Sequence, residues 1–413
     1  MIQYGRSEND VQKGRDYIWD AAFYNGKYYI YFGILPALIL LIPYYMVTGE
    51  YMLSSLAILI FSVLTIISMK ELIKSIFKRY FNDVPFNLMV YSLIILLFGS
   101  QILVINGRPK FYELAVISGL FFAITGIVFL FNAIEDEKIE YRYLFGSSLF
   151  LSLSVACRPT MLLTSFIAMP YFIKIAINSI KKRKDIFKTF CVIGIPYLII
   201  GGLLMYYNYI RFNSIFEFGA SYQLTVNDMS HLKNRLATIW TGIMCNLFGI
   251  PKFTASFPFV QNNEDIITFY GYYYRESMLG GLFILVPICF FIFTIGKIYI
   301  KSERKESFWG ALIFIVTGII MCILSIMMAG SLPRYLADYA WILIIGGIMS
   351  FVELRNLYIT EEAKMLLDKI LKILVIYIVF INLCTGINSE KKYFEAISPE
   401  DYYKIKYTVD FWE

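Results

Sequence analysis

Long runs of apolar residues recur along the chain, separated by short polar stretches. Backbone groups in lipid must hydrogen-bond within their own segment, so an apolar run of about 20 residues predicts a membrane-crossing α-helix. The runs 143–157 and 160–178 are short, and the alternative for them is one passage kinked at Pro159. We expect an all-α polytopic membrane protein with about ten transmembrane helices. The predicted helices lie near 51–69, 87–105, 112–133, 143–157, 160–178, 188–207, 278–299, 308–329, 336–352 and 368–386.

Lysine and arginine gather in four clusters between these runs. Positively charged loops of membrane proteins face the cytoplasm. With all four clusters on that side, the predicted helices alternate in direction without exception. The clusters are Lys70, Lys74, Lys78 and Arg79; Lys181, Lys182, Arg183, Lys184 and Lys188; Lys297, Lys301, Arg304 and Lys305; and Arg355, Lys364 and Lys369.

This orientation divides the chain into regions. The short connections 106–111, 158–159 and 330–335 fall on the external face, together with two longer external segments and the N-terminal region. The expected regions are an external loop with an interfacial helix at 1–50, a first bundle at 51–207, an external loop at 208–277, a second set of helices at 278–386 and an external tail at 387–413.

The apolar run 34–49 is short for a crossing and contains Pro36 and Pro43. We expect an interfacial or re-entrant helix there. Residues 1–33 would then lie outside, with no helix before them to carry them across. Either 34–49 does span the membrane, or a transmembrane helix upstream of residue 1 is absent from this sequence; we favour the second alternative.

Composition agrees with lipid as the solvent. Of 413 residues, 58% are hydrophobic and 16% are charged, against roughly 25% charged in soluble proteins. The formal charge of +6 resides in the loop clusters, and no basic stripe indicates a nucleic-acid partner. The single histidine, His231, argues against a Ser/His/Asp triad or a multi-histidine metal site. Any chemistry must therefore rest on carboxylates, arginine, lysine, tyrosine and asparagine.

Two arginines stand at external helix ends, where an unpaired charge is costly. Arg158 lies between two apolar stretches beside Pro159, so it needs a carboxylate or phosphate partner. Arg334 and Asp338 are four residues apart and share a helix face. They either pair with each other or leave Arg334 for a substrate phosphate.

Glu113 lies at the apolar boundary of the run 112–133, and such a carboxylate usually lines a cavity or meets a partner. Arg108 either anchors at the lipid headgroups or contributes to an external anion site. Lys27 follows Asp16, Trp19 and Asp20 in an aromatic segment. That segment is either a solvated surface or a substrate-facing loop with Lys27 near a phosphate.

The segment YYNYIRFNSIFEFGASYQL (206–224) alternates aromatic and polar residues. Aromatic faces stack on the apolar faces of sugars, while amides and charges bond hydroxyls. The plainer interpretation is an interfacial amphipathic stretch. The candidate substrate contacts are Asn208, Arg211, Glu217, Tyr222 and Gln223.

Taken in order, these segments resemble the bacterial polytopic glycosyltransferases of the GT-C superfamily, which includes protein mannosyltransferases and aminoarabinose transferases. The resemblance covers about 20–400. Its stretches are NGKYYIYFGILPALILLIPYYMVTGEY (25–51), the Arg-Pro of NGRPKFYE (106–113), CRPT (157–160), YNYIRFNSIFEFGASYQL (207–224) and RYLADYAWIL (334–343).

The resemblance implies a GT-C-like fold with external juxtamembrane helices in the bacterial cytoplasmic membrane, active face outward. It implies transfer of a sugar from a polyprenyl-phosphate donor to a lipid, glycan or protein acceptor. The family's leading Asp should lie upstream of residue 1, since Asp16 and Asp20 are poor substitutes. Glu113 stands where the family has a second acidic residue that helps hold a metal or the donor phosphate, and Lys27 matches a basic position only loosely.

Our main hypothesis is inverting sugar transfer in which Arg158 and Arg334 contact the donor phosphate. A divalent cation, Mg²⁺ or Mn²⁺, is an optional part of this hypothesis, and Glu113 is assigned to either the metal or the substrate. A truncated, inactive transferase is one alternative. Others are a lipid-linked sugar flippase, which would need a polar path through the bilayer, and a non-catalytic envelope-polysaccharide assembly protein.

Overall fold

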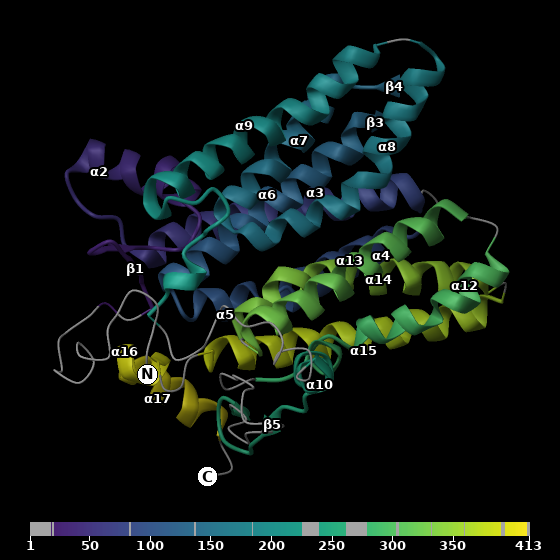
Figure 1. Ribbon diagram of the computed structural model, residues 1–413. Coiled ribbons are helices and arrows are strands. Elements are labelled where there is room, and N and C mark those ends of the chain that lie inside the picture. The colour runs from purple at the N-terminus through teal and green to yellow at the C-terminus, as the bar shows by residue number, and fades with distance from the viewer. Residues whose placement is uncertain are drawn as a thin grey trace.

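Helices dominate the computed structural model (Figure 1). It describes residues 18, 20–81, 84–135, 138–183, 185–224, 239–261, 279–302, 305–331, 333–358, 360–389 and 393–410. The longer helices are α3 (Ser54–Tyr80), α4 (Phe86–Gly99), α6 (Phe111–Ala133), α7 (Tyr141–Cys157), α8 (Ser165–Lys181), α9 (Ile186–Phe212), α10 (Ile239–Phe248), α13 (Lys305–Ala329), α14 (Pro333–Leu357), α15 (Glu361–Ile387) and α17 (Pro399–Val409).

Shorter elements connect these helices. The short helices are the π-helix η1 (Ala37–Leu41), α2 (Ile42–Thr48), α5 (Ile102–Asn106), η2 (Pro159–Thr164), η3 (Ala220–Tyr222), α11 (Leu282–Leu285), η5 (Pro287–Thr294), α12 (Ile295–Lys301) and α16 (Tyr393–Ile397). Three antiparallel hairpins pair β1 (Ala22–Tyr24) with β2 (Lys27–Tyr29), β3 (Ile134–Glu135) with β4 (Lys138–Ile139), and β5 (Lys252–Phe253) with β6 (Val260–Gln261).

Eight helical segments of the described chain are long and apolar enough to cross a membrane. They coincide with eight of the ten predicted helices, which confirms an all-α polytopic membrane architecture. The other two predictions correspond to α7 and to the succession of α11, η5 and α12. The eight segments are Ser54–Tyr80, Phe86–Asn106, Phe111–Ala133, Pro159–Lys181, Ile186–Phe212, Lys305–Met328, Pro333–Leu357 and Glu361–Ile387.

The turn at Pro159 separates two antiparallel passages. A Cβ on Gly126 of α6 would meet Leu151 of α7, and one on Gly119 would meet Met161 of η2. Farther along α6, the ring of Phe131 lies 6.0 Å from that of Tyr171 in α8. Helix α7 therefore runs back along α6, and after the turn α8 runs along α6 in the opposite direction. The alternative of one kinked passage was wrong.

Two boundaries differ from the prediction. The predicted helix 51–69 continues to Tyr80, so the first basic cluster lies on the last turns of α3; long Lys and Arg side chains can extend to the interface from a continuing helix. The predicted helix 278–299 is broken at Val286, before Pro287. Proline lacks the N–H that a continuous helix needs there, and the apolar composition concealed the break.

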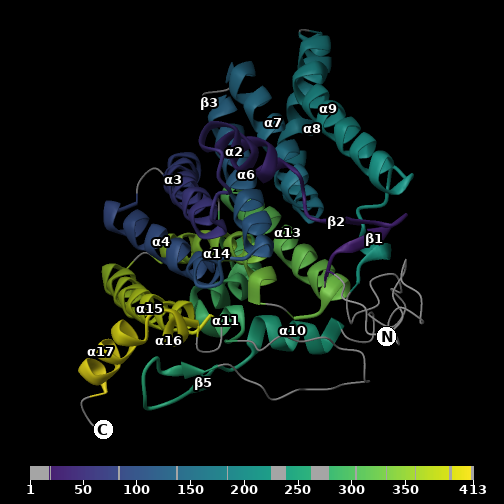
Figure 2. The ribbon, with the colours of Figure 1, turned by 90° about the vertical axis from the view of Figure 1, so that its left-hand side faces the viewer.

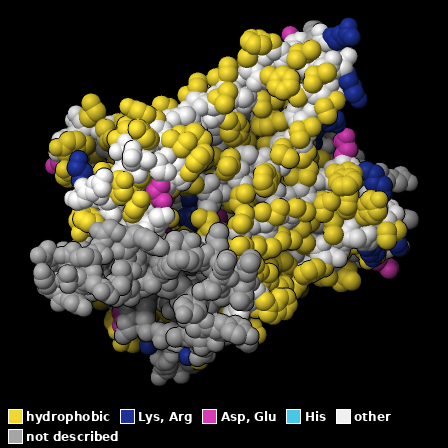
Figure 3. All heavy atoms as spheres, viewed as in Figure 1, with side chains coloured by type: hydrophobic (Ala, Val, Ile, Leu, Met, Phe, Trp, Pro, Cys, Tyr) yellow, Lys and Arg dark blue, Asp and Glu magenta, His cyan; other side chains and the backbone are white. Residues whose placement is uncertain are grey.

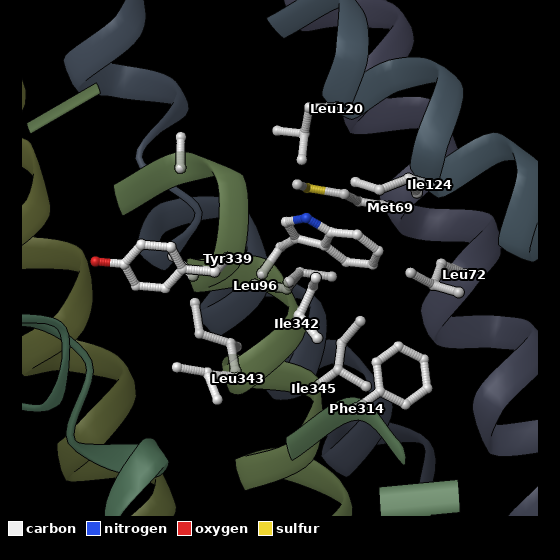
Figure 4. Packing of buried hydrophobic residues seen from close by; sticks show 14 of the residues in the cluster. Met69, Leu72, Leu96, Leu120, Ile124, Phe314, Tyr339, Ile342, Leu343 and Ile345 are labelled. Atoms are coloured by element: carbon white, nitrogen blue, oxygen red, sulfur yellow. The ribbon is translucent and has the colours of Figure 1, made fainter. Parts of the chain in front are cut away.

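Helix α14 forms the centre of the molecule and packs against α13, α4 and α6. Its side chains Ile342 and Ile345 lie among Leu72 of α3, Leu96 of α4 and Phe314 of α13 (Figure 4). An apolar helix buried on all sides has its position fixed by close packing. The external end of α14 is therefore a rigid support for the residues that it carries.

Basic side chains gather at one end of the molecule, on the right in Figure 3. Arg79 at the end of α3 donates to the carbonyl of Ile134 over 3.2 Å. Lys297 donates to the Tyr358 hydroxyl over 3.2 Å. We call this the basic end. The predicted external connections meet at the opposite end, the site end, which faces the viewer in Figure 2.

At the site end, Asn246 of α10 donates to Ser331, which lies before α14, over 2.6 Å. Helices η1 and α2 extend from this end with no buried residue. Their interfacial location, and which end faces the cytoplasm, stay predictions.

Candidate functional site

Three side chains from distant parts of the chain donate to one carboxylate, that of Asp20. The donors are the Tyr112 hydroxyl, the Gln223 amide and, over 3.4 Å, the Tyr31 hydroxyl. The Asp20 N–H in turn donates to the carbonyl of Leu224 over 2.9 Å. Since hydrogen bonds to a charged group are stronger than neutral ones, this carboxylate is held in a defined orientation.

Arg158 forms an ion pair with the buried carboxylate of Asp338. The distance from Arg158 Nη2 to Asp338 Oδ2 is 2.8 Å, and Arg158 Nε also donates to Thr160 over 3.1 Å. A residue before proline is restricted to extended conformations, so Pro159 ends α7 and holds Arg158 at φ −155° and ψ 118°. The guanidinium is thereby directed from the end of α7 toward α14.

The ring of Tyr335 lies near the guanidinium groups of both Arg158 and Arg334. Its centroid is 4.4 Å from the guanidinium carbon of Arg158 and 5.2 Å from that of Arg334. Arg334 also lies 4.7 Å from the centroid of Tyr112. Two of the predicted arginines therefore meet at a single aromatic ring, and cation–π attraction helps hold them there.

Tyr31 donates to Asp20 and lies close enough to Arg334 to feel its charge. Burial raises the pKa of the Tyr31 phenol, and the neighbouring Tyr335, Asp20 and Tyr112 raise it further, while Arg334 lowers it. The hydroxyl therefore stays protonated and donates. We call the following set the arginine–tyrosine cluster: Asp20, Tyr31, Tyr112, Arg158, Arg334, Tyr335 and Asp338.

Two further predicted residues, Arg108 and Glu113, lie beside each other at the start of α6. Arg108 Nε is 3.9 Å from Glu113 Oε1, and the Glu113 side chain is buried. Within the described ranges, no group of three histidine, cysteine or acidic residues is arranged to hold a metal ion. A neighbouring guanidinium also disfavours a cation at Glu113. The described residues thus do not fit the metal site of the hypothesis.

The candidate substrate-binding residues of segment 208–224 hold this segment in place against the N-terminal hairpin. Arg211 donates to the carbonyl of Ile30 over 2.9 Å and to Asn208 over 2.8 Å. Glu217 accepts from the backbone N–H of Gly219 over 2.6 Å. Gln223 alone of these candidates donates to the arginine–tyrosine cluster, through Asp20, whereas Asn208, Arg211 and Glu217 hold the backbone.

Tyr222 packs against Phe212, with 5.7 Å between ring centroids. Lys27 is exposed at the turn end of the β1–β2 hairpin, whereas Asp20 precedes the open end of that hairpin. Asp16, Trp19 and His231 lie outside the described residues.

From the sequence, we expect Asp20 to be a poor substitute for the leading Asp of the GT-C enzymes that the chain resembles. In the structure, Asp20 lies in the arginine–tyrosine cluster. Tyr112 and Tyr335 were not singled out, because tyrosines abound at membrane interfaces. Tyr31 was noted only as one of several tyrosines in the N-terminal segment. A usable signal was their position: Tyr112 and Tyr335 each adjoin an ionisable residue, Glu113 and Arg334, at the external end of an apolar run.

Fold and site together define a multi-pass α-helical membrane protein with a polar cluster at one end. No family model matches the chain, and no curated protein matches it. A crystal structure of ArnT from Cupriavidus metallidurans bound to undecaprenyl phosphate is similar, with a TM-score of 0.47 and 10% identity. The match covers 95% of this chain and 71% of that one. A likeness this distant does not establish a family or an activity for this chain.

Proposed function

We propose that this protein is a membrane glycosyltransferase that moves a sugar from a polyprenyl-phosphate donor to an acceptor hydroxyl at the external face. The observation that carries the proposal is the meeting of Arg158, Arg334 and Asp20 in one cluster. Guanidinium groups suit phosphate oxygens, and a fixed carboxylate suits removal of a hydroxyl proton. Both functions are needed for glycosyl transfer.

In the proposed reaction, the acceptor oxygen attacks the anomeric carbon of the donor sugar from the face opposite the phosphate. The new carbon–oxygen bond forms as the bond between that carbon and the phosphate oxygen breaks, so the configuration inverts. Asp20 takes the acceptor proton. Arg158 and Arg334 stabilise the negative charge that develops on the departing polyprenyl phosphate. Because the residues around Glu113 do not fit a metal, no step depends on one.

Asp338 supports this arrangement without contacting the substrate. Its ion pair with Arg158 fixes the guanidinium before the donor binds, which lowers the cost of ordering that side chain in the complex. Tyr335 has the same effect on Arg334 and Arg158, because its ring contacts both guanidinium groups.

The test is transfer by the full chain in lipid nanodiscs, with radiolabelled polyprenyl-phosphate sugar and extracted envelope glycans as acceptors. We expect Asp20→Asn, Arg158→Ala and Arg334→Ala each to lower transfer at least a hundredfold, on the order of the effect of removing one charge-stabilising group. Arg142→Ala is the matched control: Arg142 is exposed at the basic end, 3.7 Å from Glu140.

Folding of each variant is checked by size-exclusion chromatography. Transfer that persists in folded Asp20→Asn and Arg334→Ala would refute the assignment. So would wild-type protein that binds the donor but transports it across the bilayer without breaking its phosphate bond.

A further inference from the structure

Four aromatic rings form a continuous group beside the arginine–tyrosine cluster. Tyr24 lies 4.6 Å from Tyr222 between ring centroids, Tyr222 lies 5.7 Å from Phe212 at an interplanar angle of 19°, and Tyr29 lies 5.4 Å from Phe212. They come from β1, β2, η3 and the end of α9, which lie together at the site end (Figure 2). We call these four residues the aromatic platform.

The platform has a buried base and a partly exposed surface. Phe212 is only 2% exposed, whereas Tyr24, Tyr29 and Tyr222 are each partly exposed. Arg211 lies 4.7 Å from the Phe212 ring and ties this base to the hairpin through Ile30. The exposed rings are therefore held in fixed orientations, so little entropy is lost when a ligand stacks on them.

Polar groups border these rings. Lys27 is exposed and pairs with Tyr24 across the hairpin, and Glu217 lies near Tyr222. Burial raises the pKa of the Tyr222 phenol, as do Tyr24 and Glu217 to smaller extents, so its hydroxyl is a hydrogen-bond donor.

Flat apolar faces with charged and hydroxyl groups at their edges match a sugar ring, which has apolar C–H faces and a hydroxyl rim. A hydrocarbon chain could contact the apolar ring faces but would make no use of the polar groups beside them.

The platform is directly connected to the proposed base. Gln223 follows Tyr222, bridges to Ala22 of β1, and donates to the Asp20 carboxylate. Strand β1 leads from Asp20 toward Tyr24, and three strand residues span roughly 10 Å at about 3.3 Å each. A short oligosaccharide can bridge that separation.

We infer that the aromatic platform binds the acceptor, and that the acceptor is an oligosaccharide. An inner sugar stacks on Tyr24 and Tyr222, and the terminal sugar presents its hydroxyl to Asp20. The inference rests on the proposed function for the role of Asp20. Binding of the oligosaccharide itself needs no donor and can be measured separately.

The experiment is saturation-transfer NMR on the full chain in nanodiscs, without donor. The probes are tetrasaccharides of glucose, N-acetylglucosamine, mannose and galactose. We expect at least one to bind, with the strongest transfer to its ring C–H protons. Tyr222→Ala and Tyr24→Ala should weaken binding about tenfold, the loss expected for one aromatic contact, whereas Tyr222→Phe should retain most of it.

Phe216→Ala is the matched control, because Phe216 is an aromatic residue of the same loop and is 73% exposed. Three results would overturn the inference: no tetrasaccharide binds, Phe216→Ala weakens binding as much as Tyr222→Ala, or a Ser/Thr-rich peptide of similar length displaces the sugar. Arg334→Ala should bind the tetrasaccharide normally while losing transfer. Platform-dependent sugar binding in a protein that never transfers a sugar would refute only the proposed function.

Discussion

Tyr112 interacts with two residues of the cluster, Arg334 and Asp20. Its ring lies 4.7 Å from the guanidinium carbon of Arg334, and its hydroxyl donates to Asp20. One side chain therefore fixes the spacing between the proposed base and a proposed phosphate-binding residue. Tyr335 has a similar position between Arg158 and Arg334, so one tyrosine ring contacts both guanidinium groups and holds two like charges near each other.

Tyr112→Phe should keep the ring beside Arg334 and remove only the hydrogen bond to Asp20. We expect transfer to fall about tenfold to a hundredfold, since a hydrogen bond to a charged group contributes about 1.5–3 kcal/mol. Initial rates at saturating donor measure this. Tyr45→Phe, on the exposed helix α2, is the control. A normal rate in Tyr112→Phe would show that the orientation of Asp20 does not limit transfer.

Asp338→Ala should destabilise the protein by about 3–5 kcal/mol, because it leaves the Arg158 charge without its carboxylate partner. The double variant Arg158→Met with Asp338→Leu should recover most of that stability and stay inactive. Denaturant unfolding in detergent micelles tests both statements. If Asp338→Ala is as stable as wild type, the 2.8 Å ion pair has no structural role.

Sequence reasoning found the arginines of the site because a charge inside an apolar run is conspicuous. It did not identify their partners. For Asp338 the sequence offered a pair with Arg334, its neighbour on the helix, as one of two alternatives, and it did not foresee the ion pair with Arg158 from another passage. Asp20 was noted but judged a poor substitute for a catalytic acid, and its hydrogen bonds to Tyr112 and Gln223 join residues 92 and 203 positions away. No local pattern encodes such contacts.

Among the elements, the junction between the N-terminal segment and α7 determines whether the site can assemble. The Gly33 N–H donates to the carbonyl of Cys157 over 3.2 Å, at the end of α7. A Cβ on Gly33 would lie 2.1 Å from the carbonyl oxygen of Ala156. Only a residue without a side chain permits this approach, so the segment that carries Asp20 and Tyr31 is anchored beside Arg158.

Gly33→Ala should push the N-terminal segment away from α7 and cost about 1–3 kcal/mol of stability, as overpacking does elsewhere. Transfer should fall more steeply than stability, because Asp20 moves relative to Arg158. Gly194→Ala in α9 is the matched control, since a Cβ there meets nothing within 4 Å. Thermal unfolding and transfer rates are compared for both variants. Equal behaviour of the two would contradict the anchoring role.

Hydropathy located the long helices well, because lipid forces every apolar run of sufficient length to be helical. Hydropathy did not predict a change of backbone conformation inside a run that stays apolar. The break at Pro287 and the π-helix Ala37–Leu41 leave no mark in hydropathy. Likewise, the last turns of α3 carry lysines that pair with Glu71 on the helix surface, at 3.6 and 3.7 Å, so charge did not end the helix.

For the molecule as a whole, the structure separates two ends of different chemistry. Positively charged side chains mark the basic end (Figure 3). The arginine–tyrosine cluster lies at the site end. The positive-inside rule then predicts that the site end faces outward. The orientation of the site end determines on which side of the membrane the proposed donor and acceptor must be.

Membrane topology can be measured with one added cysteine at a time in a Cys191→Ala background, since the other five cysteines are buried. Ser214 at the site end and Lys182 at the basic end are both exposed. In intact cells, an impermeant thiol reagent should label Ser214→Cys at once and Lys182→Cys only after the membrane is opened. The reverse pattern would place the cluster in the cytoplasm and remove the basis for an external acceptor.

The arrangement around Asp20 also has a consequence for biosynthesis. Its partners Tyr112 and Gln223 precede α14, whereas Arg334 and Tyr335 belong to the start of that helix. A ribosome completes these parts in order, so the early hairpin is made well before the Arg334 and Tyr335 side chains that complete the cluster. The cluster is therefore incomplete in a half-made chain, so the proposed sugar transfer would begin only once α14 is in place.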